Sequence, residues 1–194
     1  MKARWFIWFT LAVLAAGCAS TSEDVDVKDE TVSLVFGYFD MKEAPSGLDW
    51  VSLKRYGTPD DRQKAGWVYT LPAKEGLFYH VGIRPGSYQV DKFGGTGGIP
   101  LLTSRPFEYD FGSRGRNRTV LRIERPGIYF VGAHRYVNHA GKGLFEADKF
   151  EMQPTKQPSE KEVLQRLIKV LESDKELAVY TRQLKLAKQR LAQL

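Results

Sequence analysis

The sequence predicts a mainly β protein: an antiparallel β-sandwich followed by a C-terminal α-helical appendage of two helices or one kinked helix. Three observations lead to this prediction. Between residues 32 and 152 apolar and polar residues alternate, which is typical of half-buried strands. Glycine- and proline-rich turn sequences separate these stretches, without a helical pattern between them. After residue 158 the apolar spacing changes to three and four residues, which indicates amphipathic helices.

Residues 1–17 contain the parts of an export signal. Lys2 and Arg4 give the positive start, residues 5–14 are apolar, and small residues lead to Cys18, the only cysteine. Ten helical residues cover about 15 Å, roughly half of a bilayer's hydrocarbon core. A permanent transmembrane helix is therefore not expected here.

The sequence Leu14-Ala15-Ala16-Gly17-Cys18 resembles the lipobox of a bacterial lipoprotein signal, with Ala15 where that family usually carries a branched aliphatic residue. The resemblance implies cleavage between Gly17 and Cys18 and acylation of Cys18 with palmitate-like chains. Two such chains hold a soluble domain stably on a membrane. In a Gram-negative host, Ala19 after the cysteine implies sorting to the outer membrane.

Residues 18–31 are polar and acidic, and we expect a lipidated, disordered tether. The chain has 29 basic and 23 acidic residues, a mild excess that argues against nucleic-acid binding, as does export. With one cysteine and three scattered histidines, neither a structural metal site nor a bound cofactor is expected.

The domain predicted over residues 32–152 contains eight or nine strands. Its first strand presents Val32, Leu34, Phe36 and Tyr38 on one side. We place the strands near 33–39, 49–55, 66–70, 76–83, 86–93, 106–111, 118–125, 127–137 and 143–152. The glycine-rich segment 94–98 is predicted to be a loop, and since Pro100 follows it instead of a helix, a phosphate cradle is not expected.

A short sequence motif occurs twice. Residues 83–90 are Ile-Arg-Pro-Gly-Ser-Tyr-Gln-Val, and residues 123–131 are Ile-Glu-Arg-Pro-Gly-Ile-Tyr-Phe-Val. Each Pro-Gly pair suits a type II turn and predicts a hairpin. The repeated step resembles the prealbumin-like (transthyretin-like) sandwich domains, including those of bacterial lipoproteins of unknown function. The alternative is two ordinary hairpins in another β-sandwich.

Residues 153–158 are predicted to be a linker, and residues 159–194 to form amphipathic helices. Ser159 and Glu162 have the spacing of a capping box, and Ser173 with Glu176 could repeat it. A short heptad seam follows, and its candidate partner-binding residues are Leu177, Tyr180, Leu184 and Leu191. The alternative is that these helices belong to the protein's own core.

Four arginines form a candidate anion-binding row. Arg114, Arg116 and Arg118 are spaced by two and share a face if the segment is extended, and Arg122 follows. The alternative is a solvated turn whose charges keep a sheet edge from pairing with another strand. Trp50, Tyr56, Trp67 and Tyr69 could stack on sugars, although strand spacing makes them more typical of a core.

The sequence contains no recognisable catalytic motif, and His134 and His139 are predicted to be polar surface residues, so we do not expect an enzyme. The leading hypothesis is a membrane-anchored lipoprotein acting as a non-enzymatic protein-interaction or scaffolding module, with an envelope protein as partner. The alternative is binding of an anionic lipid, lipopolysaccharide or cell-wall glycan through the arginine-rich face.

Overall fold

The computed structural model describes residues 29–44, 47–56, 68–97, 105–111, 120–139 and 149–194. The strands are β1 (Ser33–Asp40), β2 (Trp50–Tyr56), β3 (Val68–Lys74), β4 (Leu77–Ile83), β5 (Gly86–Gly97), β6 (Arg105–Asp110), β7 (Val120–Ile123), β8 (Ile128–His139) and β9 (Lys149–Thr155). The helices are α1 (Glu160–Ser173) and α2 (Thr181–Leu191). The predicted mainly β fold with a helical C-terminus is confirmed.

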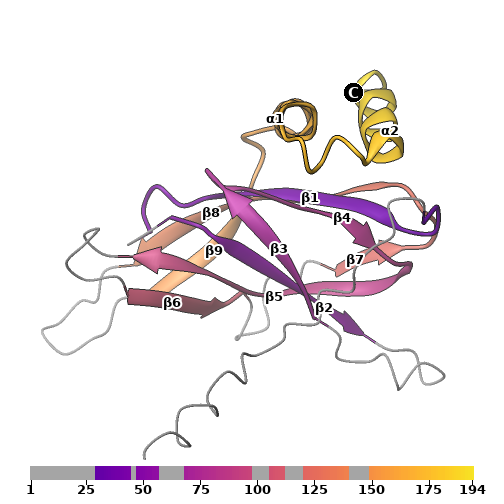
Figure 1. Cartoon of the computed structure of the whole chain (residues 1–194). Helices are drawn as coiled ribbons and strands as arrows, with labels where there is room; N and C mark the ends of the chain where they lie inside the picture. The colour runs from indigo at the N-terminus through magenta and orange to yellow at the C-terminus, as the bar shows by residue number, and fades with distance from the viewer. Residues whose placement is uncertain (1–28, 45–46, 57–67, 98–104, 112–119, 140–148) are drawn as a thin grey trace, which may run out of the picture.

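The nine strands form one curled sheet in the order β6-β5-β2-β3-β4-β1-β8-β9, with β7 also paired to β5. The curl makes two layers, which Figure 1 shows one above the other. Layer A contains β4, β1, β8 and β9, and layer B contains β6, β7, β5 and β2. Strand β3 pairs with β2 through residues 68–72 and with β4 through residues 73–74, and so joins the layers. The prediction of a wholly antiparallel sheet was wrong in one place, because β1 and β8 run parallel.

The space between the layers holds the main apolar core. Phe39 lies at its centre, with its ring centroid 4.8 Å from Phe78, 5.6 Å from Phe93 and 5.3 Å from Phe111. In β1, Gly37 lies opposite Phe78, and a Cβ there would come within 2.3 Å of the Phe78 ring. The missing side chain is therefore what gives this ring its space.

The helices cover the outer surface of layer A (Figure 1) and bury a second apolar cluster there. The fully or nearly fully buried members are Leu34, Phe36, Leu77, Val163, Leu164, Leu167, Ile168, Leu171 and Ala187. The predicted capping box starts α1: Ser159 Oγ accepts from the Glu162 N–H at 3.3 Å, and Glu162 Oε2 accepts from the Ser159 N–H at 2.7 Å. The appendage is thus a covering layer of the domain.

The repeated Pro-Gly phrase does not form hairpins. The first copy carries the chain from β4 in layer A to β5 in layer B, and the second carries it from β7 in layer B to β8 in layer A. In both copies the tyrosine hydroxyl donates to the carbonyl of the arginine four residues earlier: Tyr88 to Arg84 and Tyr129 to Arg125, each at 2.7 Å. These bonds resemble the tyrosine corners of other β-sandwiches. The repeat therefore marks two crossings between layers.

Three boundaries differ from the sequence prediction. Strand β5 continues through Gly97, so most of the predicted glycine loop is strand paired with β6. Strand β9 extends to Thr155, because residues 153–155 of the predicted linker pair with β8. Ser173 ends α1 and does not cap a second helix; Tyr180 precedes α2 without a side-chain capping bond.

The helical layer should stabilise the fold directly. Replacing the buried Leu167 with Ala should lower the free energy of unfolding by about 2–5 kcal/mol, since a cavity would open between α1 and layer A. Urea unfolding followed by circular dichroism measures this, with the exposed Gln165→Ala as the matched control on the same helix. Equal stability of the two variants would mean that α1 does not pack on the sheet.

The tyrosine–carbonyl bonds at the two corners should contribute differently to the free energy of unfolding. Tyr88 is fully buried, so Tyr88→Phe leaves the Arg84 carbonyl without its donor and should cost about 1–3 kcal/mol. Tyr129 makes the same bond at the exposed second corner, and Tyr129→Phe should cost less than about 1 kcal/mol. Thermal unfolding of both variants checks the order, and a larger loss for Tyr129→Phe would contradict it.

Candidate functional site

Most residues of the predicted anchor and arginine row lie outside the described residues: Gly17, Cys18, Arg114, Arg116 and Arg118. Arg122 is described. It lies on β7 opposite Ser87 of β5, with an exposed side chain. The structure therefore places one member of the candidate row, on the outer surface of layer B.

The predicted partner-binding seam is occupied by the protein itself. Leu177, Leu184 and Leu191 pack against the second apolar cluster, and Ala187 of the same seam is fully buried. Tyr180 immediately precedes α2 and is partly buried. The structure therefore favours the alternative given from the sequence, that these helices belong to the protein's own core.

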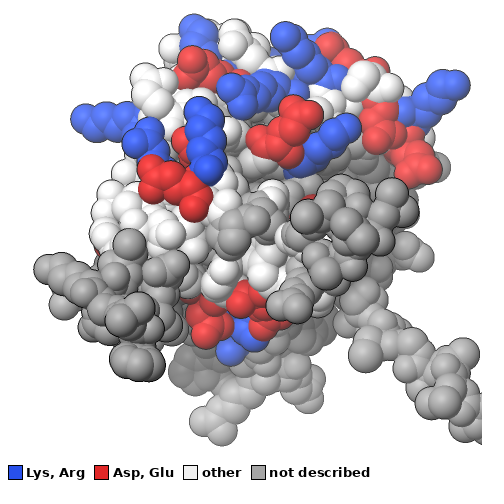
Figure 2. Space-filling view, turned by 90° about the vertical axis from the view of Figure 1, so that its left-hand side faces the viewer, with Lys and Arg blue, Asp and Glu red and all other residues white. Residues whose placement is uncertain are grey.

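Ion pairs hold α2 beside α1. Arg190 donates to both carboxylate oxygens of Glu160, from Nε at 2.9 Å and from Nη2 at 3.2 Å, and Lys188 Nζ lies 2.7 Å from Glu172 Oε1. Figure 2 shows positive and negative side chains interspersed over the upper part of the visible face. We see no single-sign patch there that would suggest a charged partner.

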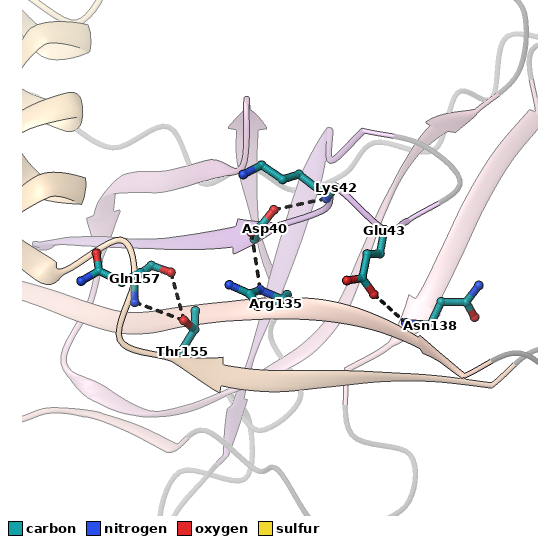
Figure 3. A network of polar contacts seen from close by, with 7 residues as sticks. All are labelled: Asp40, Lys42, Glu43, Arg135, Asn138, Thr155 and Gln157. Carbon is teal, nitrogen blue, oxygen red and sulfur yellow. Dashed lines mark hydrogen bonds and ion pairs between the residues drawn. The ribbon is translucent and has the colours of Figure 1, made fainter.

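A polar network ties the end of β1 to β8 (Figure 3). Asp40 Oδ2 lies 3.7 Å from Arg135 Nε, and Asp40 Oδ1 accepts from the Lys42 N–H at 3.2 Å. Glu43 accepts from the Asn138 N–H at 3.4 Å. The Asp40–Arg135 and Glu43–Asn138 contacts join β1 and the segment after it to β8, and the bond between Asp40 and Lys42 is local, so we interpret the network as structural.

His134 is buried, contrary to the prediction of a surface residue. Its ring meets Phe39 and Phe111 edge-on, at centroid distances of 5.6 and 5.0 Å. The cause is a bulge in β8 between Phe130 and Ala133, where Gly132 has φ +119°. The bulge shifts the alternation by one residue, so even-numbered positions turn from the helices to the core. His139 is exposed, with Nε2 3.7 Å from Glu151 Oε2.

The outer surface of layer B is the candidate site, and we call it the open face because no described helix covers it (Figure 1). Strand register arranges its side chains in cross-strand rows. One row runs Val68, Lys54, Gln89 and Val120 across β3, β2, β5 and β7. The adjacent row runs Tyr56, Ser87 and Arg122.

The open face concentrates exposed apolar groups. Tyr56 is 46% exposed, Val68 49% and Val120 55%. The Tyr56 hydroxyl donates to Gln89 Oε1, which fixes the ring across β5. Of the other aromatic residues considered from sequence, Tyr69 is buried and Trp67 lies outside the described residues. Trp50 is half-buried in a row of its own with Pro72 and Gly94.

Two outward cations, Lys54 and Arg122, lie on the part of the open face formed by β2, β3, β5 and β7, and β2, β3 and β7 contain no acidic residue. The neighbouring strand β6 carries Asp110 and Glu108, and Glu108 pairs with Lys92 of β5, so the open face as a whole has mixed charge. Arg55 points inward, where its Nη2 donates to the Pro85 carbonyl at 3.0 Å. Lys54 and Arg122 remain on the outer surface. Sequence reasoning found Arg122, but it did not associate it with Lys54 or Tyr56, because strand register brings them together.

Comparisons with protein-family models, with curated proteins and with solved structures found no match for this chain. In the described part of the chain, no three His, Cys, Asp or Glu side chains are grouped so that they could hold a metal ion. No described helix is long and apolar enough to cross a membrane.

The buried histidines should make stability depend on pH. Burial lowers the pKa of His134, and likewise of His80, to about 4. An unfolded histidine titrates near 6.5, so between pH 6.5 and 4 the unfolded chain binds more protons than the folded one. The free energy of unfolding should therefore fall as pH drops through this window, by up to about 3 kcal/mol for His134.

Urea unfolding at a series of pH values measures this loss, and His134→Leu should reduce it. The loss that remains in this variant should come largely from His80. An unchanged pH dependence in His134→Leu would show that His134 is not the titrating group.

Proposed function

We propose that this protein is a membrane-anchored lipoprotein that acts as a non-enzymatic binding or scaffolding module in the cell envelope. The lipobox-like sequence ending at Cys18 supports the anchor, and Ala19 supports the outer membrane as its location in a Gram-negative host. Asp29 is the first described residue, eleven positions after Cys18, and β1 begins four residues later. The anchored segment thus leads directly into the folded domain.

The observation that carries the proposal is the difference between the two outer surfaces of the sandwich. Helices α1 and α2 cover layer A, whereas layer B keeps a solvent-exposed sheet face with three large apolar side chains. Exposed apolar groups gathered on one surface favour a contact role. The open face therefore replaces the helix seam as the surface we expect to engage an envelope partner.

The described part of the chain begins beside the helical layer. The Val32 carbonyl accepts from Arg182 of α2 at 3.3 Å, and Asp29 lies 4.0 Å from Arg84, which follows β4 of layer A. The anchored segment therefore joins the domain beside the helices.

The anchor is tested by intact mass and membrane fractionation of the native protein beside a Cys18→Ser variant. We expect a mature chain that begins at Cys18, carries added acyl mass and sediments with membranes, and we expect the variant to lose both properties. Ser20→Ala, which keeps the cysteine, is the matched control and should behave as the native protein. A native chain without acyl mass in the soluble fraction would refute the anchor.

A further inference from the structure

We propose that the open face binds an acidic glycan of the envelope, a carbohydrate chain that bears carboxylate or phosphate groups. This inference deepens the proposed function and rests on the envelope location proposed there. Three features of the open face support it: the exposed apolar side chains, the two outward cations and the size of the face.

The size of the open face suits a short oligosaccharide. Neighbouring strands lie about 4.8 Å apart, so a row across four strands spans about 14 Å, and adjacent rows lie about 7 Å apart. The two rows together therefore cover about 200 Å². A stable protein interface buries about 800 Å² on each partner. A partner protein would need contacts beyond this face.

The apolar groups on the open face offer a stacking surface next to hydrogen-bonding groups. Sugar rings present C–H faces that pack on aromatic and aliphatic side chains, and Tyr56, Val68 and Val120 are each about half exposed. Ser87 lies between Tyr56 and Arg122 in the second row, whereas Gln89 of the first row is only 8% exposed and supports the Tyr56 ring from below. Because the Tyr56 hydroxyl is bonded to Gln89, its ring is held in place before a ligand arrives.

The two outward cations, Lys54 and Arg122, favour a negatively charged ligand. Lys54 on β2 and Arg122 on β7 are two strands and one row apart, about 12 Å between backbones. Within the described residues neither side chain forms an ion pair, and Glu124 follows β7 beyond its last paired residue. Two cations at this separation fit a polymer with repeated anionic groups better than one small anion. The Arg122 guanidinium can bind one such group bidentately.

The test is calorimetric titration of the mature chain, residues 18–194 with Cys18→Ser so that it carries no acyl group. The probes are hexagalacturonate, which is carboxylated, and phosphomannan, which is phosphorylated; maltohexaose is the neutral control. We expect binding of at least one acidic probe, weakening as ionic strength rises, and much weaker binding of maltohexaose. Failure to bind either acidic probe, or equal binding of the neutral one, would overturn the proposal.

Site variants locate the binding. Arg122→Gln and Lys54→Gln should each weaken binding about tenfold, and Arg122→Lys should weaken it less. Lys169→Gln removes the same charge from the exposed side of α1 and should leave affinity unchanged. Thermal unfolding confirms that each variant is folded. An equal loss in Lys169→Gln, or none in Arg122→Gln, would show that binding does not occur on the open face.

Two further titrations separate other anionic partners. Phosphatidylglycerol vesicles or polyglutamate that bind more tightly than both glycans, with the same dependence on Arg122, would overturn the glycan assignment. The anchor is judged independently, by mass and fractionation of the native protein. An acylated, membrane-bound chain that ignores acidic glycans would refute this inference and leave the proposed function standing.

Discussion

Strand β1 buries apolar side chains on both of its faces, and the remaining architecture depends on this. In β1, Leu34 and Phe36 turn toward the helices while Val35 and Phe39 turn toward the core, and all four are fully buried. A strand with apolar groups on both sides needs two covers. Layer B supplies one cover, and α1 with α2 supplies the other. The C-terminal helices are therefore required by the first strand of the domain.

The same requirement explains why the sequence alone could not decide between the two interpretations of the helix seam. Spacing by three and four residues shows that a helix buries one side, but it carries no information about what covers that side. Leu184 and Leu191 would have the same pattern against a partner helix as against α1. The capping box at Ser159 was predictable because both of its bonds lie within four residues. The helix start is thus local information, and its docking is not.

Strand existence was predictable, whereas strand pairing was not. Alternation identified all nine strands, since each has at least one face on the core. A Pro-Gly pair suits a hairpin and a crossing between layers equally, and only the pairing of β5 with β2 and β7 distinguishes them. The bulge at Gly132 is similar: one inserted residue reverses the alternation after it, so His134 has the sequence context of a surface residue and the position of a core residue.

The candidate site is built from the same non-local information. Arg122, Lys54 and Tyr56 come from β7 and β2, and they share a surface only because β5 lies between those strands in one register. The outermost strands offer less to a partner, because β6 contains Pro106 and β9 contains Pro154, and proline hinders addition of a further strand. The helices cover the apolar outer residues of β1 and β4, and both outermost strands contain proline, so we place recognition on the exposed apolar part of layer B. Its lysine and arginine keep the exposed valines and tyrosine soluble and, in our proposal, select the ligand's charge.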